Sequence, residues 1–335
     1  MRTVLVTGGA GFIGSHLVDQ LLDDGAAVRV LDNLSTGSLA NLRAAADRHS
    51  RGNGTLSGSR IEVIIGDVRD RELLRKALRG VKHVFHLAAL PASAVPVTDP
   101  GDIHAVNVEG TLNLLHGALT EGVWRVVLGS CASVYGTPDH LPVPEEAPLR
   151  PETLFAASKV AAETYCRAFH ARHQLDTVAL RYFSVYGPRQ RSVPPGGLVP
   201  HLIEALRQRR AVSDLDDRTA EDLTYVDDAV AATLAAARAP RAAGCVINVG
   251  SGHMVTVGEV LSIVSDLLRV PSVSGFSRAP ETAPHRISAQ TALASKLLDF
   301  TPRVSLIAGL ARVVRSLAEA EEPEPHTLAP VGLDE

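Results

Sequence analysis

The sequence predicts an α/β protein in which a doubly wound parallel sheet is joined by a smaller C-terminal domain. Short apolar runs of strand length alternate with segments of helical period through the first two thirds of the 335 residues, which is typical of parallel βαβ units. A glycine-rich turn separates the first apolar run from the first helical segment. The length allows roughly two domains at about 150 residues each.

The individual elements follow from the same alternation. Leu17, Val18, Leu21 and Leu22 share one face of an expected helix over residues 15–24. The polar, aperiodic stretch 44–60 is interpreted as a surface insertion. The expected strands are Thr3–Val6, Ala27–Leu31, Ile61–Ile65, His83–His86, Val126–Leu128, Thr177–Leu180 and, returning to the main sheet, Cys245–Val249.

Composition excludes several classes of protein. Hydrophobic residues make up 45% and charged residues 21%, which is typical of a globular chain. The net charge is −4 without a long block of one sign, so we expect no nucleic acid as a partner. The apolar run Val4–Val6 is too short for a signal peptide, and no stretch of about 18 apolar residues is available for a membrane.

The three cysteines, Cys131, Cys166 and Cys245, are widely spaced and form no CxxC pair. This spacing argues against a disulfide framework and against a thiolate zinc site. We therefore expect a cytoplasmic protein without a bound metal.

The glycine-rich turn reads Thr7-Gly8-Gly9-Ala10-Gly11-Phe12-Ile13-Gly14. Glycines at this place allow a tight turn and a close approach of the backbone to a pyrophosphate at the helix N-terminus. Asp32 ends the second expected strand 18 residues after Gly14, where a carboxylate can bind a ribose 2′-hydroxyl. A 2′-phosphate would be repelled there, so the sequence predicts NAD rather than NADP.

Further motifs follow the third and fourth strands and the segments beyond. Gly66-Asp67-Val68 and Leu87-Ala88-Ala89 stand at carboxyl ends of strands, where sheets of this class bind ligands. Seven further motifs bear on the class of the protein: Asp32-Asn33-Leu34-Ser35-Thr36-Gly37, Asn107-Val108-Glu109-Gly110-Thr111, Ser133-Val134-Tyr135-Gly136, Ala157-Ser158-Lys159, Arg181-Tyr182-Phe183, Tyr186-Gly187-Pro188-Arg189 and Tyr225-Val226-Asp227-Asp228.

Together these motifs resemble the extended short-chain dehydrogenase/reductase family, and within it the NAD-dependent nucleotide-sugar epimerases and dehydratases, over about residues 1–315. The resemblance implies a Rossmann-type sheet and a bound NAD. The residues that it assigns to NAD are Gly8, Gly11, Phe12, Ile13, Gly14, Asp32, Asn33, Ser35, Thr36, Gly37, Asp67, Val68, Leu87, Ala88, Ala89, Lys159 and Tyr182.

The resemblance also implies a domain division and a dimer. Residues 1–183, with 224–250 returning to them, would form the NAD-binding domain. Residues 184–223 and 251–318 would bind the nucleotide sugar, and the tail 319–335, rich in Glu and Pro, would be poorly ordered. Helices over Asp102–Leu119 and Phe155–His173 would pair two copies into a homodimer.

Members of this family oxidise a sugar hydroxyl with a Tyr-x-x-x-Lys pair, and here that pair reads Phe155 and Lys159. The phenolic base is therefore missing, and losing a general base typically removes a rate effect of about 10²–10⁴. A second departure is Cys131 at the family's Ser/Thr position, with Ser133 as a nearby hydroxyl. A plain packing role for Cys131 fits the sequence as well.

Two explanations fit Phe155. The protein is a natural relative that has lost catalysis, or a Tyr→Phe substitution was made to trap a bound substrate. Lys159 and the intact cofactor motifs favour the second explanation, because drift after loss of function would not spare them.

The resemblance narrows the reaction by subtraction. Dehydratases of the family carry an Asp-Glu pair where this chain has Ala132 and Ser133, and Ser133 also argues against decarboxylation. Oxidation and re-reduction at C4 remain, which is 4-epimerisation of a UDP-sugar.

The choice of sugar depends on a few residues, most of them in the second domain. Arg191 resembles the arginine that uronate epimerases present to a C6 carboxylate, and Ser184 agrees, so UDP-glucuronate to UDP-galacturonate is favoured. Pro91 instead resembles epimerases of UDP-glucose and UDP-GlcNAc. A protein that binds NAD and a nucleotide sugar without catalysis is the remaining alternative. The other residues expected to contact substrate are Arg189, Gly197, Leu198, Val199 and Arg286, and Glu221 stands where relatives often carry arginine.

Overall fold

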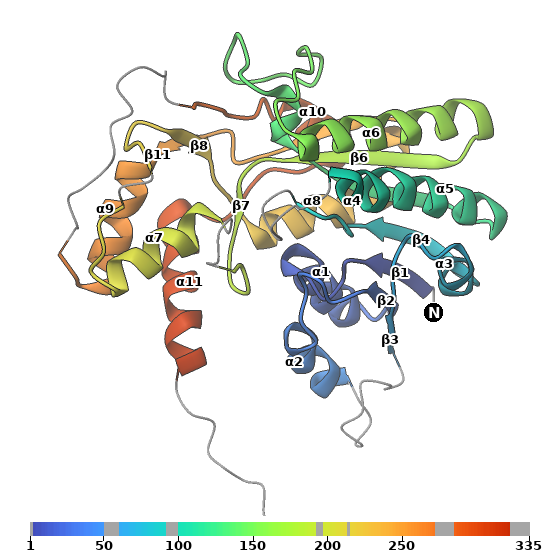
Figure 1. The fold of residues 1–335 in the computed structure, drawn as a ribbon, viewed down its shortest axis with the longest axis horizontal. Coiled ribbons are helices and arrows are strands. Elements are labelled where there is room, and N and C mark those ends of the chain that lie inside the picture. The colour runs from blue at the N-terminus through green and yellow to red at the C-terminus, as the bar shows by residue number, and fades with distance from the viewer. Residues whose placement is uncertain are drawn as a thin grey trace, which may run out of the picture.

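The computed structural model describes residues 3–49, 60–91, 100–191, 197–212, 215–271 and 285–321. Within them, a seven-stranded parallel sheet has the strand order β10-β6-β5-β4-β1-β2-β3 (Figure 1). The strands are β1 (Thr3–Thr7), β2 (Ala27–Asp32), β3 (Ile61–Ile65), β4 (Val81–His86), β5 (Arg125–Cys131), β6 (Asp176–Tyr182) and β10 (Val246–Val249). The order reverses between β1 and β4, which is the point where such sheets bind ligands. The predicted doubly wound α/β fold is confirmed.

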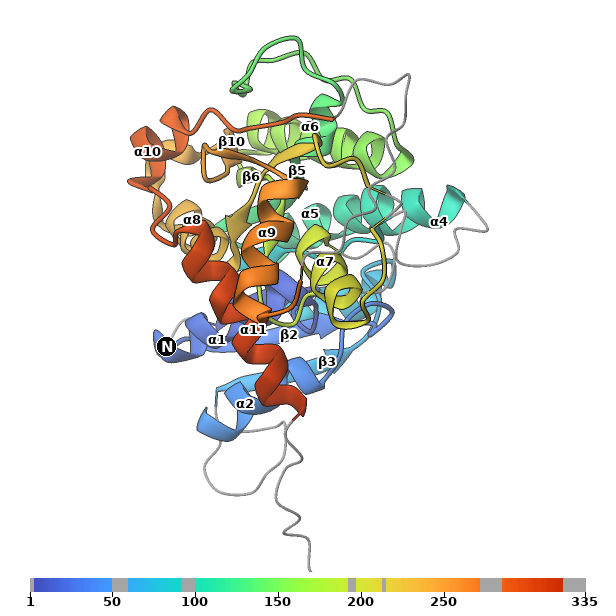
Figure 2. The same cartoon turned by 90° about the vertical axis from the view of Figure 1, so that its left-hand side faces the viewer.

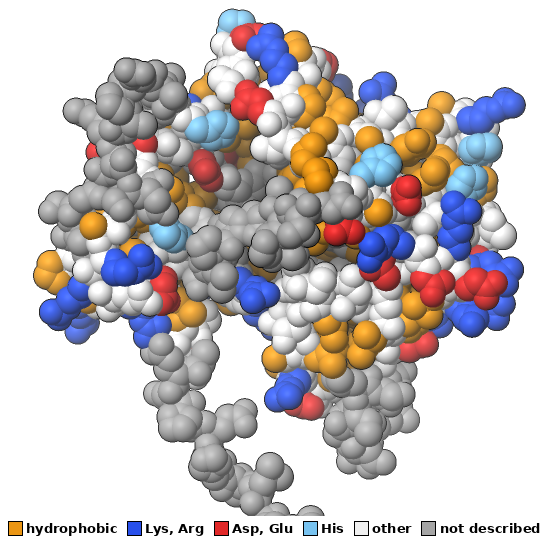
Figure 3. Space-filling view, in the orientation of Figure 1, with side chains coloured by type: hydrophobic (Ala, Val, Ile, Leu, Met, Phe, Trp, Pro, Cys, Tyr) orange, Lys and Arg blue, Asp and Glu red, His pale blue; other side chains and the backbone are white. Residues whose placement is uncertain are grey.

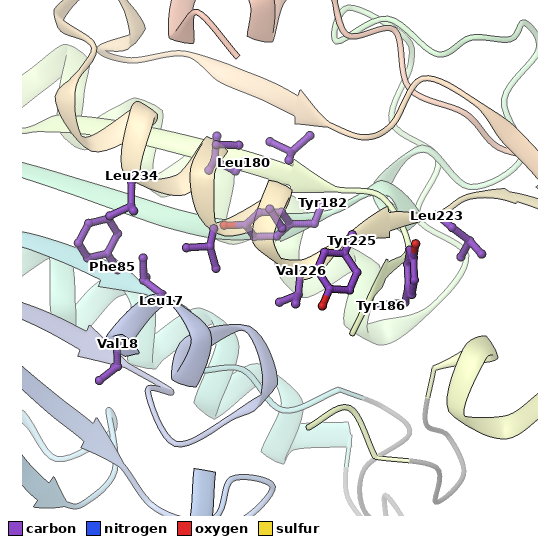
Figure 4. Packing of buried hydrophobic residues seen from close by; sticks show 14 of the residues in the cluster. Leu17, Val18, Phe85, Leu180, Tyr182, Tyr186, Leu223, Tyr225, Val226 and Leu234 are labelled. Carbon is purple, nitrogen blue, oxygen red and sulfur yellow. The ribbon is translucent and has the colours of Figure 1, made fainter. Parts of the chain in front are cut away.

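Helices cover both faces of this sheet. On one face lie α1 (Phe12–Asp23), α2 (Ala40–His49) and α8 (Val226–Arg238), and on the other α3 (Arg71–Leu78), α5 (Gly110–Thr120) and α6 (Leu154–His173). The first face is packed by Leu17 of α1 against Phe85 of the sheet, and the tyrosines Tyr182, Tyr186 and Tyr225 continue this core toward the second part of the chain (Figure 4).

One expectation is wrong. The stretch 44–60 was expected to be an aperiodic insertion, but residues 40–49 form helix α2. Leu42, Ala45 and Ala46 are buried at helical spacing against α1. One leucine and two small alanines give a weak apolar signal among polar neighbours. Residues 50–59 of the stretch lie outside the described residues.

The second part of the chain packs beside the carboxyl ends of the strands. Helix α7 (Leu198–Arg207) packs on α9 (Val257–Leu268), and α9 packs on α11 (Leu306–Glu321) (Figure 2). Two small sheets pair β7 (Val185–Tyr186) with β9 (Thr224–Tyr225) and β8 (Ala220–Asp222) with β11 (Met254–Thr256). The short helix α10 (Ala292–Leu298) also belongs to this part, whereas the short helix α4 (Pro100–His104) precedes α5 and packs against α6. Of the expected tail, residues 319–321 belong to α11, and 322–335 lie outside the described residues.

Asp222 joins three distant segments of this second part. Its side chain is fully buried, and its two oxygens accept hydrogen bonds from the backbone N–H groups of Ser251, Gly252 and Ala289 at 2.6, 2.9 and 3.0 Å. A buried carboxylate is stable only when its oxygens are satisfied in this way. Asp222 therefore holds the segments after β8, after β10 and before α10 in one arrangement.

The surface of the face seen in Figure 3 carries charged side chains of both signs, interspersed with apolar ones. No helix among the described residues is long and apolar enough to cross a membrane. In the same part of the chain, His, Cys, Asp and Glu side chains form no group of three that could hold a metal ion.

Candidate active site

A cavity of about 740 Å³ opens at the carboxyl ends of the sheet strands, between the sheet and the second part of the chain. Most of the residues predicted from the sequence line it together. They are Gly8, Gly11, Phe12, Ile13, Gly14, Asp32, Asn33, Ser35, Thr36, Asp67, Val68, Leu87, Ala88, Ala89, Pro91, Cys131, Ser133, Phe155, Lys159, Tyr182 and Ser184. The cavity therefore brings the proposed cofactor residues and the proposed reacting residues into one space.

The glycine turn shapes one end of this cavity. Gly8 has a φ of +70°, which favours glycine, and a Cβ added at Gly14 would collide with the Gly8 carbonyl oxygen. Gly11 caps the start of α1 without a side chain of its own, so the helix N-terminus meets the cavity as bare backbone. This arrangement fits the pyrophosphate of a dinucleotide.

Asp32 is held at the end of β2 by backbone donors. Its Oδ2 accepts from the N–H of Ala10 at 2.9 Å and its Oδ1 from the N–H of Leu34 at 2.8 Å, which leave lone pairs on both oxygens for ribose hydroxyls. Gly37 packs directly against this carboxylate: a Cβ at Gly37 would lie 2.9 Å from Ala10 and 3.1 Å from the Asp32 Oδ1. Gly37 itself does not line the cavity. These contacts fix the carboxylate in place.

Asp67 follows the neighbouring strand β3 and lies beside the loop that follows Asp32. Its carboxylate accepts from Asn33 at 2.9 Å and from the Arg69 guanidinium at 2.9 and 3.0 Å. Burial alone would raise the pKa of Asp67, but the hydrogen bonds from Arg69 and Asn33 outweigh it and lower the pKa to about 2.

A buried hydrogen-bond chain beneath the cavity floor was not predicted from the sequence. His86 joins Thr7 on its Nδ1 at 2.7 Å and Thr111 on its Nε2 at 2.9 Å, and Thr111 donates onward to the Asn107 carbonyl at 2.6 Å. Because Thr111 donates its own hydrogen, His86 must donate from Nε2 and accept at Nδ1. Burial, with a smaller contribution from Lys159, lowers the pKa of His86 to about 3.

Asn107 extends this chain to the cavity wall. It lies in a π-helical turn, Ala105–Glu109, between α4 and α5, and its side chain bonds both backbone groups of Leu90 at 2.7 and 3.1 Å. Its amide also donates to the Ser158 hydroxyl at 2.9 Å. The Asn107-Val108-Glu109-Gly110-Thr111 motif alone predicts no role for Asn107. Its position in a π-bulge, a common feature of functional sites, is visible only in the structure.

Phe155 and Lys159 lie one turn apart on the cavity face of α6. The Lys159 ammonium is 5.6 Å from the centre of the Phe155 ring and donates to the Gly129 carbonyl at 2.8 Å. Lys159 is only 5% exposed, and burial lowers its pKa. Thr153 caps this helix by accepting from the Ala156 N–H at 3.1 Å, so the first turn that carries Phe155 is well defined.

Cys131 ends β5 on the same cavity and stands 2.8 Å from the Ser133 hydroxyl, measured from its sulfur. Burial raises the pKa of the Cys131 thiol, against smaller opposing effects of Ser133 and Lys159. The thiol is therefore a protonated, weak hydrogen-bond donor at neutral pH rather than a thiolate nucleophile.

A second cavity of about 250 Å³ adjoins the first, and the expected substrate residues Gly197, Leu198 and Val199 line it. Ser184 lines both cavities. Three predicted substrate arginines line neither. Arg189 is paired with Asp19 of α1 at 2.7 Å, Arg191 is exposed beside Gln190, and Arg286 is exposed where the chain bridges to Ala220.

Comparison with known proteins agrees with this geometry. The family model described as NAD dependent epimerase/dehydratase family matches residues 4–250. The chain belongs to this family. NAD is accordingly the cofactor of this epimerase/dehydratase, and the glycine turn and the Asp32 carboxylate provide the features that a dinucleotide requires.

Relatives of this epimerase/dehydratase are similar over nearly their whole length. It is 35% identical to a UDP-glucose 4-epimerase of Mycolicibacterium smegmatis, over 94% of this chain and 97% of that protein. A UDP-glucose 4-epimerase from Thermotoga maritima, solved with UDP-glucose, superimposes with a TM-score of 0.84 at 30% identity and covers 95% of this chain and 99% of its own. MoeE5, solved in complex with UDP-glucuronic acid and NAD, gives a TM-score of 0.81 at 32% identity and covers 95% of this chain and 99% of its own.

Proposed function

We propose that this epimerase/dehydratase inverts C4 of a UDP-hexose, with UDP-glucuronate to UDP-galacturonate as the reaction. One observation carries the proposal: the Phe155 ring and the Lys159 ammonium lie side by side in the cavity that the glycine turn also lines. This supports a position for a reacting sugar within reach of a bound dinucleotide. When bound, NAD would supply the hydride-transfer chemistry that an inversion at C4 requires.

The side chains of this cavity bind the sugar and provide no groups for eliminating water from it. Cys131, as a protonated thiol at the end of β5, and Ser133 just after it are hydrogen-bonded to each other, so whichever of them accepts from the other keeps a hydrogen for the sugar oxygen. Lys159, buried and anchored on Gly129, presents its ammonium to the nicotinamide ribose. Ala132 has no ionisable group, so this wall lacks the acid and base that elimination of water requires.

Phe155 determines the expected rate. Its ring fills the place of a phenol but has no oxygen that could take the proton of the C4 hydroxyl, so we propose that turnover is slow. Restoring the phenol by Phe155→Tyr should raise the rate of 4-epimerisation at least about tenfold, and by up to the usual 10²–10⁴ effect of a general base. Proton NMR of the product sugars measures the rate directly.

The matched control is Leu154→Tyr. It adds the same phenol one residue earlier on α6, where the side chain is 53% exposed and does not line the cavity. Its rate should stay at that of the unmodified protein. Equal rates for the two tyrosine variants would contradict the assigned site.

A second candidate function is binding of NAD and a nucleotide sugar without catalysis. The observation that favours it is the same phenylalanine, because the cavity retains its cofactor residues while the base is absent. The two candidates differ in one result. A binding protein gains no turnover from Phe155→Tyr on UDP-glucuronate, UDP-glucose or UDP-GlcNAc, although calorimetry still detects binding of one of them.

A further inference from the structure

The wall between the two cavities consists of residues that line both of them. Ser184, Val185 and Gln190 are shared, so a ligand that occupies both spaces must pass these side chains. The remaining lining of the second cavity is largely apolar and includes Tyr186, Leu198, Val199 and Leu223. The polar groups on the shared wall therefore decide which chemistry this space accepts.

Gln190 presents an unpaired acceptor on this wall. Its Nε2 donates to the Val185 carbonyl at 2.9 Å, which fixes the orientation of the amide. Its Oε1 is buried and has no hydrogen-bond partner among the described residues. An unsatisfied buried acceptor is costly, so an incoming donor would gain more here than at a solvated group.

The backbone around Gln190 is held in an unusual conformation. Arg189, its neighbour, has a φ of +67°, and the Arg189 guanidinium is bound by Asp19 of α1 at 2.7 Å. His16, also on α1, hydrogen-bonds the Pro188 carbonyl at 2.9 Å. A left-handed backbone at a residue other than glycine persists only where surrounding contacts hold it in place. The helix that begins at the cofactor site thus holds the loop that aims Gln190.

Glu221 supplies a second acceptor. One carboxylate oxygen, Oε2, accepts from the Ser184 hydroxyl, and no hydrogen bond to Oε1 occurs among the described residues. Glu221 is also the charged member of the second cavity's described lining, which holds no Lys, Arg or His. A phosphate or carboxylate brought against this wall would meet like charge without a compensating cation.

We propose that the second cavity takes a hydroxyl-bearing ring of the substrate, and that Gln190 and Glu221 accept hydrogen bonds from its hydroxyls. The inference rests on the proposed function, in which the substrate is a nucleotide sugar. Such a ring offers donors at its edge and C–H groups on its faces, which suits two acceptors above an apolar floor. With UDP-glucuronate as the substrate, the ring is the ribose, because the C6 carboxylate of the hexose would meet Glu221. A neutral hexose is the other ring that the test distinguishes, and in both cases the diphosphate lies away from Glu221.

The experiment is calorimetric titration of the NAD-loaded protein with three probes: UDP-glucose, UDP and 2′-deoxy-UDP. The ratio of Kd values for UDP and UDP-glucose reports hydrogen bonds to the hexose. The ratio for 2′-deoxy-UDP and UDP reports those to the ribose. A site built to bind hydroxyls discriminates strongly against a ligand that lacks them, so one of the two ratios should exceed about ten.

Two variants then test the acceptors. Glu221→Gln keeps an oxygen for Ser184 and replaces the other acceptor by a donor, while Gln190→Met removes the amide at similar length. Each should lower the same ratio at least about fivefold. Glu72→Gln, the same chemical change on exposed α3, should leave both ratios unchanged. Thermal melting identifies a variant that fails to fold. The Kd ratios of the other variant then test the proposal.

The outcomes separate this inference from the proposed function. Binding of all three probes with both ratios unchanged in the variants would overturn the role of Gln190 and Glu221 and leave the epimerase proposal intact. Failure of every uridine nucleotide to bind the unmodified protein would overturn both.

Discussion

Arg181 and Glu163 form a buried, two-point ion pair that ties β6 to α6. The Arg181 Nη2 and Nε atoms donate to the two Glu163 oxygens at 2.7 and 3.0 Å, and the side chains are only 5% and 4% exposed. Ser130 at the end of β5 also donates to Glu163, and Arg181 donates to the Tyr135 hydroxyl at 2.8 Å. The helix that carries Phe155 and Lys159 is thereby fixed against the two strands that lead into the cavity.

Removing one partner of this pair should destabilise the protein strongly. Glu163→Ala leaves Arg181 buried without its counter-charge, which typically costs about 3–5 kcal/mol of unfolding free energy. Urea unfolding followed by circular dichroism measures it. Asp139→Asn removes a partner from the exposed pair with Arg150 and should leave the unfolding midpoint nearly unchanged. Similar losses in both variants would contradict the burial argument.

Stability should fall in acid because His86 is neutral in the fold. Its pKa is lowered from 6.5 to about 3 by burial, so the unfolded chain binds a proton that the folded chain does not between these values. Stability is therefore lost as the pH falls from about 6.5 toward 3, by up to about 1.4 kcal/mol per pH unit from this group.

Thermal melting between pH 7 and 4 tests the role of His86. His86→Gln, which cannot titrate, should show a shallower decrease than the unmodified protein. The control His140→Gln changes an exposed loop histidine and should keep the original slope. A slope that is unchanged in His86→Gln would refute the assignment.

Gly14→Ala should impair the cofactor site. The added methyl would collide with the Gly8 carbonyl, a backbone atom that cannot move aside without opening the turn. We expect NAD affinity to fall at least about tenfold, or 1.4 kcal/mol. Gly258→Ala on α9, where a Cβ meets its nearest neighbours at 3.6 and 3.7 Å, should bind NAD normally and gain about 0.5–1 kcal/mol of stability. Calorimetry with NAD compares them.

Arg191→Ala tests the choice of sugar. If Arg191 binds the C6 carboxylate, the variant should lose at least about tenfold in affinity for UDP-glucuronate, because a hydrogen bond to a charged group contributes about 1.5–3 kcal/mol. Affinity for UDP-glucose should not change. Arg241→Ala, an exposed arginine after α8, is the control. Equal losses for both sugars would favour a neutral hexose, as in an epimerase of UDP-glucose.

We also propose that two copies associate through the outer faces of α5 and α6. These neighbouring helices expose Leu119, Leu154 and Tyr165 by 39%, 53% and 38%. Sedimentation should give a dimer, and Leu119→Lys with Tyr165→Lys should shift it toward monomer, because the charges cannot be buried unpaired. Ile307→Lys, at a residue of α11 that is 61% exposed, should leave the dimer intact. A monomer at micromolar concentration would end this proposal.

The sheet and the cofactor turn were predictable because their signals are local. Strand length, helical period and the glycine spacing are each readable within about 30 residues. The carboxyl ends of parallel strands then place Asp32, Asp67 and Ala88 at one edge without further information. Helix α2 was missed because its buried face consists of Leu42 and two alanines, whose apolar signal is weak.

The polar network and the substrate wall were not predictable from local signals. His86 joins Thr7 and Thr111, which are 79 and 25 residues away in the chain. Arg189 could not be placed by its motif, since its left-handed backbone directs the guanidinium to α1, away from both cavities. Domain boundaries and the roles of the cavity residues stay predictions.

Strand β10 completes the sheet beside β6, although about 64 residues separate them in the chain. During synthesis, the backbone edge of β6 therefore stays unpaired until the ribosome has released residue 249. A fragment that stops at residue 183 would expose this edge permanently and would tend to recruit other chains. The N-terminal part of the sheet thus depends on β10, which is synthesised later, for protection against edge-to-edge aggregation.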